Sequence, residues 1–138
     1  MGTARAAHTA SLLADGRVLV AGGTNPASGR QLATCEVFDP ADGDWRATGG
    51  MDGARALHTA TVLGDGSVLV AGGYRLGDGS LSSAELYDVP GGVWVPAAGM
   101  PRPLSPASAT ALRGGEVLVV GGDDSGGHTT AGAAIFRS

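Results

Sequence analysis

Three histidines and one cysteine are the side chains of this sequence best suited to bind a metal or to take part in catalysis. His8 and His58 begin two nearly identical stretches, HTASLLADGRVLVAGG (8–23) and HTATVLGDGSVLVAGG (58–73). Histidine ligates metals and transfers protons near neutral pH, so a metal site is one interpretation of the pair. However, the motif fixes no carboxylate partner for either ring, and a histidine that recurs with its surroundings is typical of a scaffold position. We expect both rings to be structural and predict no metal site.

His128 occurs outside the repeated stretches, in the glycine-rich segment GGDDSGGHTT. It is therefore the histidine that we expect to be most available for function. The adjacent Asp123 and Asp124 could hold a cation, although an acidic pair next to glycine more often solvates a turn. The single Cys35 excludes an internal disulfide and a cysteine-based zinc site, and the positions that match it in the repeats hold Ala84 and Ala133. We predict a small buried position there and no cofactor.

Familiar catalytic patterns are missing from the sequence. No Ser-His-Asp set, pair of acid–base carboxylates or phosphate-binding loop followed by a helix stands out. The serine of GGDDSGG leads into a predicted strand, which is the wrong context for a nucleophile elbow. We predict that this chain is not an enzyme.

Composition narrows the classes of partner. The chain has 138 residues, the size of one domain, and a net charge of −4 with nine Lys+Arg against 13 Asp+Glu. Without a basic patch, nucleic acid is not an expected partner. No apolar run reaches the length of a transmembrane helix, and no signal peptide is recognisable, so a membrane is not expected either. The sequence does not distinguish a cytoplasmic location from secretion as part of a longer precursor.

A repeat of 49–50 residues organises the whole chain. Met1, Met51 and Met100 open three units, 1–50, 51–99 and 100–138, and 14 of 19 positions are identical between 5–23 and 55–73. A run rich in Val and Leu predicts a strand near 17–22, joined by a turn to one near 8–13. A third strand near 34–38 carries the aromatic residue, and a fourth near 44–48 carries the Trp. Asp15-Gly16 predicts a hairpin turn in which both central residues have positive φ. Each unit is therefore expected to be a four-stranded antiparallel sheet.

Three linked motifs carry a resemblance to a known family. They are a diglycine after the second strand, an aromatic residue before Asp in the third, and a Trp in the fourth: Gly22-Gly23, Gly72-Gly73, Gly121-Gly122, Phe38, Tyr87, Trp45 and Trp94. This pattern resembles the Kelch repeat, in the bacterial form that also occurs in galactose-oxidase-like propellers. The resemblance implies an all-β fold, a β-propeller segment of about three four-stranded blades. The third unit departs from the motif, with Ala107, Ala134 and Arg137 at its His, Glu and Asp positions.

The same resemblance suggests the hypothesis of a copper site, because galactose-oxidase-like radical enzymes use a Tyr joined to a Cys. Tyr87 matches Phe38 and Phe136, so it is expected to be a core aromatic residue. The remaining tyrosine, Tyr74, does not complete a ligand set. No copper site is predicted.

The three units are too few for a ring, since propellers use roughly 4–8 blades. The third unit also lacks the Trp strand. Two expectations follow: the chain is a fragment of a larger propeller, which the missing strand favours, or copies of it self-associate to close a ring.

Recurring charges predict a structural ion pair within each of the first two units. Arg5 and Arg55 recur, as do Glu36 and Glu85. In the third unit Arg102 is shifted by two positions and the Glu position is alanine, so both partners change together. Such pairs fix register more than they add stability.

The segments after each diglycine differ most between the units, and variable loops on a repeated scaffold are where binding usually occurs. In Kelch propellers ligands commonly meet these loops, which marks Asn25, Arg30, Tyr74, Arg75, Asp123, Asp124 and His128 as candidate binding residues. The predicted function is a non-catalytic scaffold for a protein or carbohydrate ligand. Two alternatives stay open: the propeller part of an enzyme whose active site lies elsewhere, and a sugar-binding ring closed by self-association.

Overall fold

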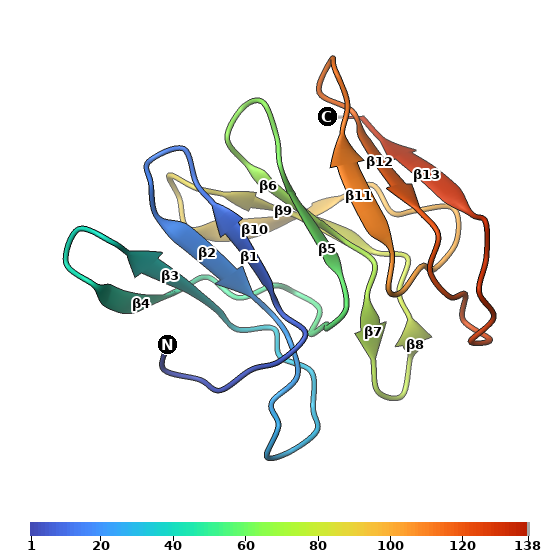
Figure 1. Cartoon of the computed structure of the whole chain (residues 1–138), viewed down its shortest axis with the longest axis horizontal. Coiled ribbons are helices and arrows are strands. Elements are labelled where there is room, and N and C mark those ends of the chain that lie inside the picture. Colours follow the sequence, from blue (N-terminus) through green and yellow to red (C-terminus); the bar gives the residue numbers. More distant parts are fainter. Residues whose placement is uncertain (138) are drawn as a thin grey trace.

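The computed structural model describes residues 1–137, and all of its regular structure is antiparallel β-sheet (Figure 1). The first sheet has the order β1-β2-β3-β4 and the second the order β10-β9-β6-β5. The third, within the described residues, has the order β11-β12-β13. The strands of these three sheets are β1 (Thr9–Leu12), β2 (Val18–Ala21), β3 (Cys35–Asp39), β4 (Asp44–Thr48), β5 (Thr59–Val62), β6 (Val68–Ala71), β9 (Ala84–Asp88), β10 (Val93–Ala97), β11 (Ser108–Ala111), β12 (Val117–Val120) and β13 (Ala133–Phe136). The prediction of repeated four-stranded sheets is confirmed for the first two units.

The three sheets lie side by side like the blades of an open propeller. The first strands, β1, β5 and β11, contact one another in sequence, so they form the inner edge of the arc (Figure 1). The Trp-bearing strands β4 and β10 lie at the opposite edge of their sheets. Each sheet falls within one of the predicted units 1–50, 51–99 and 100–138, a division that remains our proposal; residue 138 lies outside the described residues.

The prediction for the Asp-Gly turns is half wrong. Gly16 has a φ of 88°, as expected, but Asp15 is not among the residues with positive φ. The pairing explains the difference: Leu12 faces Val18, and the Leu13 N–H donates to the Arg17 carbonyl oxygen. The loop therefore has three residues rather than two, with glycine at its left-handed position. The Asp15 carboxylate instead accepts a hydrogen bond from the Arg17 N–H.

The diglycines let neighbouring sheets approach closely. Gly22 and Gly72 have φ values of 61° and 65°. A Cβ at Gly22 would lie 2.5 Å from the Arg55 carbonyl oxygen, and a Cβ at Gly72 would lie 2.5 Å from that of Leu104. The next N–H donates across the seam, from Gly23 to Arg55 and from Gly73 to Leu104. Only glycine meets both demands, since it alone combines positive φ with no side chain.

Two apolar cores fill the two seams between sheets. Cys35 and Tyr87, both predicted to be buried, are 2% and 3% exposed in the first seam, where Trp94 also packs. Burial raises the pKa of the Cys35 thiol. The outer faces of the end sheets remain uncovered in the described residues. Trp45 is 37% exposed on the first sheet, and Ile135 is 52% exposed on the third.

The predicted ion pairs are confirmed. Arg5 Nη2 lies 2.9 Å from Glu36 Oε2, and Arg55 Nη2 lies 2.7 Å from Glu85 Oε2. Both arginine side chains are almost fully buried. Each guanidinium also donates to two carbonyl oxygens, one of them in the diglycine: Gly22 and Thr34 for Arg5, Gly72 and Ser83 for Arg55. The pairs therefore tie the chain before the first strand to the beginning of the third.

Candidate functional site

Three loops that follow the diglycines, 24–34, 74–83 and 123–132, lie on the same side of the arc (Figure 1). The antiparallel order of the sheets places all three there, because each loop joins the second strand of its sheet to the third. The short hairpin turns between first and second strands lie on the opposite side (Figure 1). The sequence-variable segments thus share one surface, which we call the loop face.

The first loop presents Arg30 on a folded turn. The Asn25 side-chain oxygen accepts hydrogen bonds from the N–H groups of Ala27 and Ser28, and the Asn25 N–H donates to the Arg30 carbonyl oxygen. Asn25 therefore shapes the loop instead of pointing free into solvent. Arg30 is exposed, and its guanidinium has no ion-pair partner among residues 1–137.

The second loop is a small hairpin, in which β7 (Tyr74–Arg75) pairs with β8 (Gly79–Ser80). Tyr74 is half-buried and pairs through its backbone with Ala56. Arg75 is half-buried and ion-paired with Asp78. Leu76, at the tip, is 68% exposed. The hairpin therefore presents one large apolar side chain next to a guanidinium.

A direct contact joins the first two loops. The Gln31 side-chain oxygen accepts a 2.7 Å hydrogen bond from the Leu76 N–H. Arg30 and Arg75, both predicted binding residues, line a pocket of about 300 Å³ together with Gln31, Ala54 and Leu76. These last three residues could not be predicted from the repeat, because a contact between two loops that differ between the units follows no period. The pocket is thus a concave site with two guanidinium groups and one exposed leucine.

The third loop satisfies its own polar groups. The Asp124 carboxylate accepts hydrogen bonds from the N–H groups of His128 and Gly126, which lower its pKa. The Asp123 carboxylate accepts one from the Thr129 hydroxyl. The His128 ring is exposed, with Nδ1 3.5 Å from Asp124. The two carboxylates therefore act within the turn, and in the described part of the chain no group of three or more His, Cys, Asp or Glu is arranged to hold a metal ion.

His8 and His58 differ in environment. His58 is buried, and its Nε2 lies 2.8 Å from the Thr9 hydroxyl in the neighbouring sheet. Burial lowers its pKa to about 3, with further contributions from the positive charges of Arg55 and His8. His8 is exposed, because no sheet precedes the first one in the structure. The recurring histidine thus joins adjacent sheets, which agrees with the predicted structural role of His58.

No helix among residues 1–137 is long and apolar enough to cross a membrane. A comparison with curated proteins finds no match to this sequence. The family model described as the Kelch motif matches residues 5–52 and 54–101, which together make up more than half of the chain. Each match spans most of one of the first two repeats and includes its diglycine, its buried Arg–Glu pair and its Trp. The chain belongs to the Kelch-motif family.

Proposed function

We propose that this chain is a non-catalytic binding scaffold whose loop face recognises a protein partner. The observation that carries this proposal is the pocket between the first two loops, lined by Arg30, Gln31, Ala54, Arg75 and Leu76. The sheets beneath the loops are held by buried ion pairs and diglycine contacts, so they offer a rigid base. Kelch repeats commonly serve as protein-interaction scaffolds.

The chemistry of the pocket favours an acidic peptide segment with an apolar side chain. Guanidinium groups bind carboxylates through paired, charge-assisted hydrogen bonds. The Arg30 guanidinium is exposed without an ion-pair partner in residues 1–137, and Arg75 shares its charge with Asp78. Leu76 adds an exposed apolar side chain to the lining of the same pocket. Arginine is among the residue types that contribute most binding energy at interfaces.

Selection from a displayed library of random 12-residue peptides tests this proposal. Peptides that bind the wild-type chain should be rich in Asp, Glu and large apolar residues. Arg30→Glu should weaken their binding at least about tenfold, since it replaces attraction with repulsion. Arg17→Glu is the matched control, because Arg17 lies in a hairpin turn on the opposite side, paired with Asp15.

Two results would count against the proposal. One is a set of selected peptides without acidic residues; the other is binding that tolerates Arg30→Glu as well as it tolerates Arg17→Glu. Binding should also weaken with added salt, because exposed charges are screened.

A further inference from the structure

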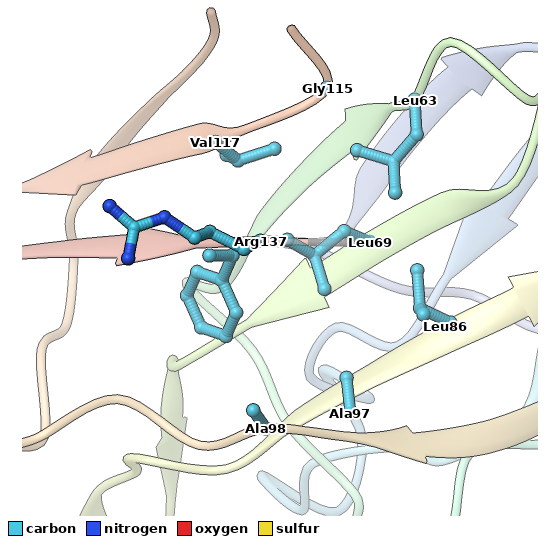
Figure 2. A pocket seen from close by; sticks show the side chains of 9 residues that line it. Leu63, Leu69, Leu86, Ala97, Ala98, Gly115, Val117 and Arg137 are labelled. Carbon is cyan, nitrogen blue, oxygen red and sulfur yellow. The ribbon is translucent and has the colours of Figure 1, made fainter.

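Two pockets of similar volume border the second sheet, but their linings differ in character. One, of about 200 Å³, lies between the second and third sheets and is lined mainly by apolar side chains of the core in that seam (Figure 2). The other, of about 220 Å³, has four charged residues in its lining, Asp52, Arg55, Arg75 and Glu85. We call this second one the charged pocket.

The charged pocket adjoins the pocket between the first two loops. Arg75 lines both of them, and Ala54 of the loop pocket follows directly on Gly53 of the charged pocket. These residues belong to the segment between β4 and β5, which lies on the loop face because β4 ends and β5 begins on the side from which the loops extend. The two pockets therefore share a wall on one surface.

Most charges of the charged pocket already have a partner. Arg55 and Glu85 form their buried ion pair, and Arg75 is paired with Asp78. The Asp52 carboxylate is exposed and has no hydrogen-bond or ion-pair partner among residues 1–137; only the Asp52 N–H is engaged, as a donor to Glu85. One negative charge is therefore left without a counter-charge in this pocket.

Gly53 keeps the charged pocket open. Its φ is outside the left-handed range, so the conformation of the backbone does not require glycine there. A Cβ at this position would lie 3.2 Å from Arg55 Nη2, 3.7 Å from Arg75 Nη1 and 3.8 Å from Glu85 Oε2. Any side chain would therefore enter the space between the charged groups.

The Asp-Gly pair at this place belongs to the second unit alone. Gly2-Thr3 matches it in the first unit, and Pro101-Arg102 matches it in the third when the units are aligned by their backbone hydrogen bonds. The first unit forms its Arg5–Glu36 ion pair with Thr3 beside it, so the ion pair does not need glycine. The repeated scaffold thus accounts for neither the free carboxylate nor the open space.

We propose that the charged pocket binds a lysine side chain of the polypeptide that the loop face recognises. The ammonium group pairs with the Asp52 carboxylate, and the aliphatic stem lies against Leu81 and Pro96, which line the same pocket. A compact ammonium group on a flexible stem suits a small pocket that already contains two guanidinium groups. An acidic residue of the same polypeptide then meets Arg30, so both unpaired charges of the surface find a counter-charge. The inference rests on the proposed function for the rest of the ligand.

The lysine site can be tested without a peptide, by NMR titration of the full chain with Nα-acetyl-lysine amide. The amide signals of Asp52 and Gly53 should shift and reach saturation. Nα-acetyl-norleucine amide lacks the ammonium group and should bind at least about threefold more weakly, the effect expected of a partly exposed ion pair. Arg30→Glu should not weaken binding of the lysine amide, since Arg30 lines only the neighbouring pocket.

Three variants locate the site. Asp52→Lys replaces attraction with repulsion and should lower affinity for the lysine amide at least about tenfold. Asp44→Lys is the matched control, because Asp44 is also exposed and without an ion-pair partner in residues 1–137 but lies in β4, outside the pocket. Gly53→Thr copies the first unit and should lower affinity at least about threefold by filling the pocket, with little change in the thermal unfolding of the chain.

The displayed peptide library extends the test to the whole ligand. Peptides selected on the wild-type chain should carry a lysine in addition to Asp or Glu. Replacement of that lysine by Gln should weaken binding to the wild-type chain but not to Asp52→Asn, which is the coupling expected of two groups in contact.

Equal shifts with the lysine and norleucine amides would overturn the lysine site, as would absence of shifts or binding that tolerates Asp52→Lys as well as Asp44→Lys. Selected peptides that depend on Arg30 but not on a lysine would overturn it as well and leave the proposed function standing. Binding of the lysine amide that depends on Asp52, in a chain that selects no acidic peptide, would support the lysine site and refute the proposed function.

Discussion

Arg55 and Glu85 form a buried ion pair whose counterpart in the next sheet is a contact region without charge. Arg55 Nη2 lies 2.7 Å from Glu85 Oε2, with the side chains 1% and 6% exposed. One unit later, Leu104 occupies the arginine position and is fully buried, and Ala134 occupies the glutamate position. Leu104 is equivalent to Arg55 because its carbonyl oxygen accepts from Gly73 as that of Arg55 accepts from Gly23. One framework thus accommodates either a charged or an apolar pair.

This comparison predicts strong coupling between the two residues. Arg55→Leu should destabilise the fold by about 3–5 kcal/mol, because it leaves the Glu85 carboxylate buried without its partner. Glu85→Ala should cost a similar amount. The double variant reproduces the Leu104–Ala134 arrangement and should cost much less than the sum, as found when buried pairs are replaced by apolar residues. Urea unfolding of the four proteins gives the coupling energy, and additive losses would contradict the prediction.

His58 should make the stability of the fold depend on pH in a defined window. Burial lowers its folded pKa from 6.5 to about 3, so the unfolded chain binds a proton that the folded chain does not. The free energy of unfolding therefore keeps its full value above pH 6.5 and decreases as the pH falls towards 3. At pH 5 the free energy of unfolding should be about 2 kcal/mol lower, because pH 5 lies 1.5 units below the unfolded pKa of 6.5.

The measurement is urea unfolding at pH 7.5 and pH 5.0. His58→Ala should reduce the difference between the two conditions, because alanine, as in Ala107 of the third unit, does not titrate. His8→Ala is the control and should keep most of the difference, since His8 is exposed. A pH dependence that survives in His58→Ala would assign it to other groups.

Much of this architecture could be predicted from the sequence because its motifs repeat in successive units. The strands, the diglycine contacts and the Arg–Glu pairs each depend on residues that recur at one spacing. Cys35 could be placed in the core because the other units hold alanine there. In such cases, comparing equivalent positions in the repeat units shows which residue types the packing requires.

Features that occur once could not be predicted in this way. The third unit was aligned on Arg102, but Leu104 takes the place of Arg55, because position in the backbone and not residue type defines equivalence. The contact between Gln31 and Leu76 joins two loops whose sequences differ between the units, so no repeat predicts it. The three-residue turn around Asp15 recurs in all three units and was still not predicted, because Asp-Gly fits more than one loop length.

The left-handed conformation of Leu57, which Ala7 shares one unit earlier, was not predicted from the sequence either, and it offers a route to higher stability. Leu57 has a φ of 56° and is 45% exposed, so it accepts a strained conformation with little burial in return. A left-handed residue with a Cβ costs roughly 1–2 kcal/mol, which glycine avoids. Leu57→Gly should therefore leave stability unchanged or raise it by up to about 1 kcal/mol, after the greater freedom of glycine in the unfolded chain is included.

The control is Leu12→Gly in β1. Leu12 is 68% exposed in a regular strand, so glycine there removes no left-handed strain and should destabilise by about 0.5–1 kcal/mol. Equal losses in the two variants, measured by thermal or urea unfolding, would show that Leu57 carries no relievable strain.

Gly72 should be the opposite case, a glycine that cannot gain a side chain. Its φ is 65°, and an added Cβ would lie 2.5 Å from the Leu104 carbonyl oxygen and 2.9 Å from Met100 Cε. Because the backbone of the neighbouring sheet cannot retreat without opening the seam, Gly72→Ala should cost more than about 2 kcal/mol, from left-handed strain and overpacking together. Gly64→Ala is the matched control: no atom lies within 4 Å of its Cβ position and its φ is outside the left-handed range, so stability should be unchanged or slightly higher. Equal stability of the two variants would mean that close approach of the sheets does not require the diglycine.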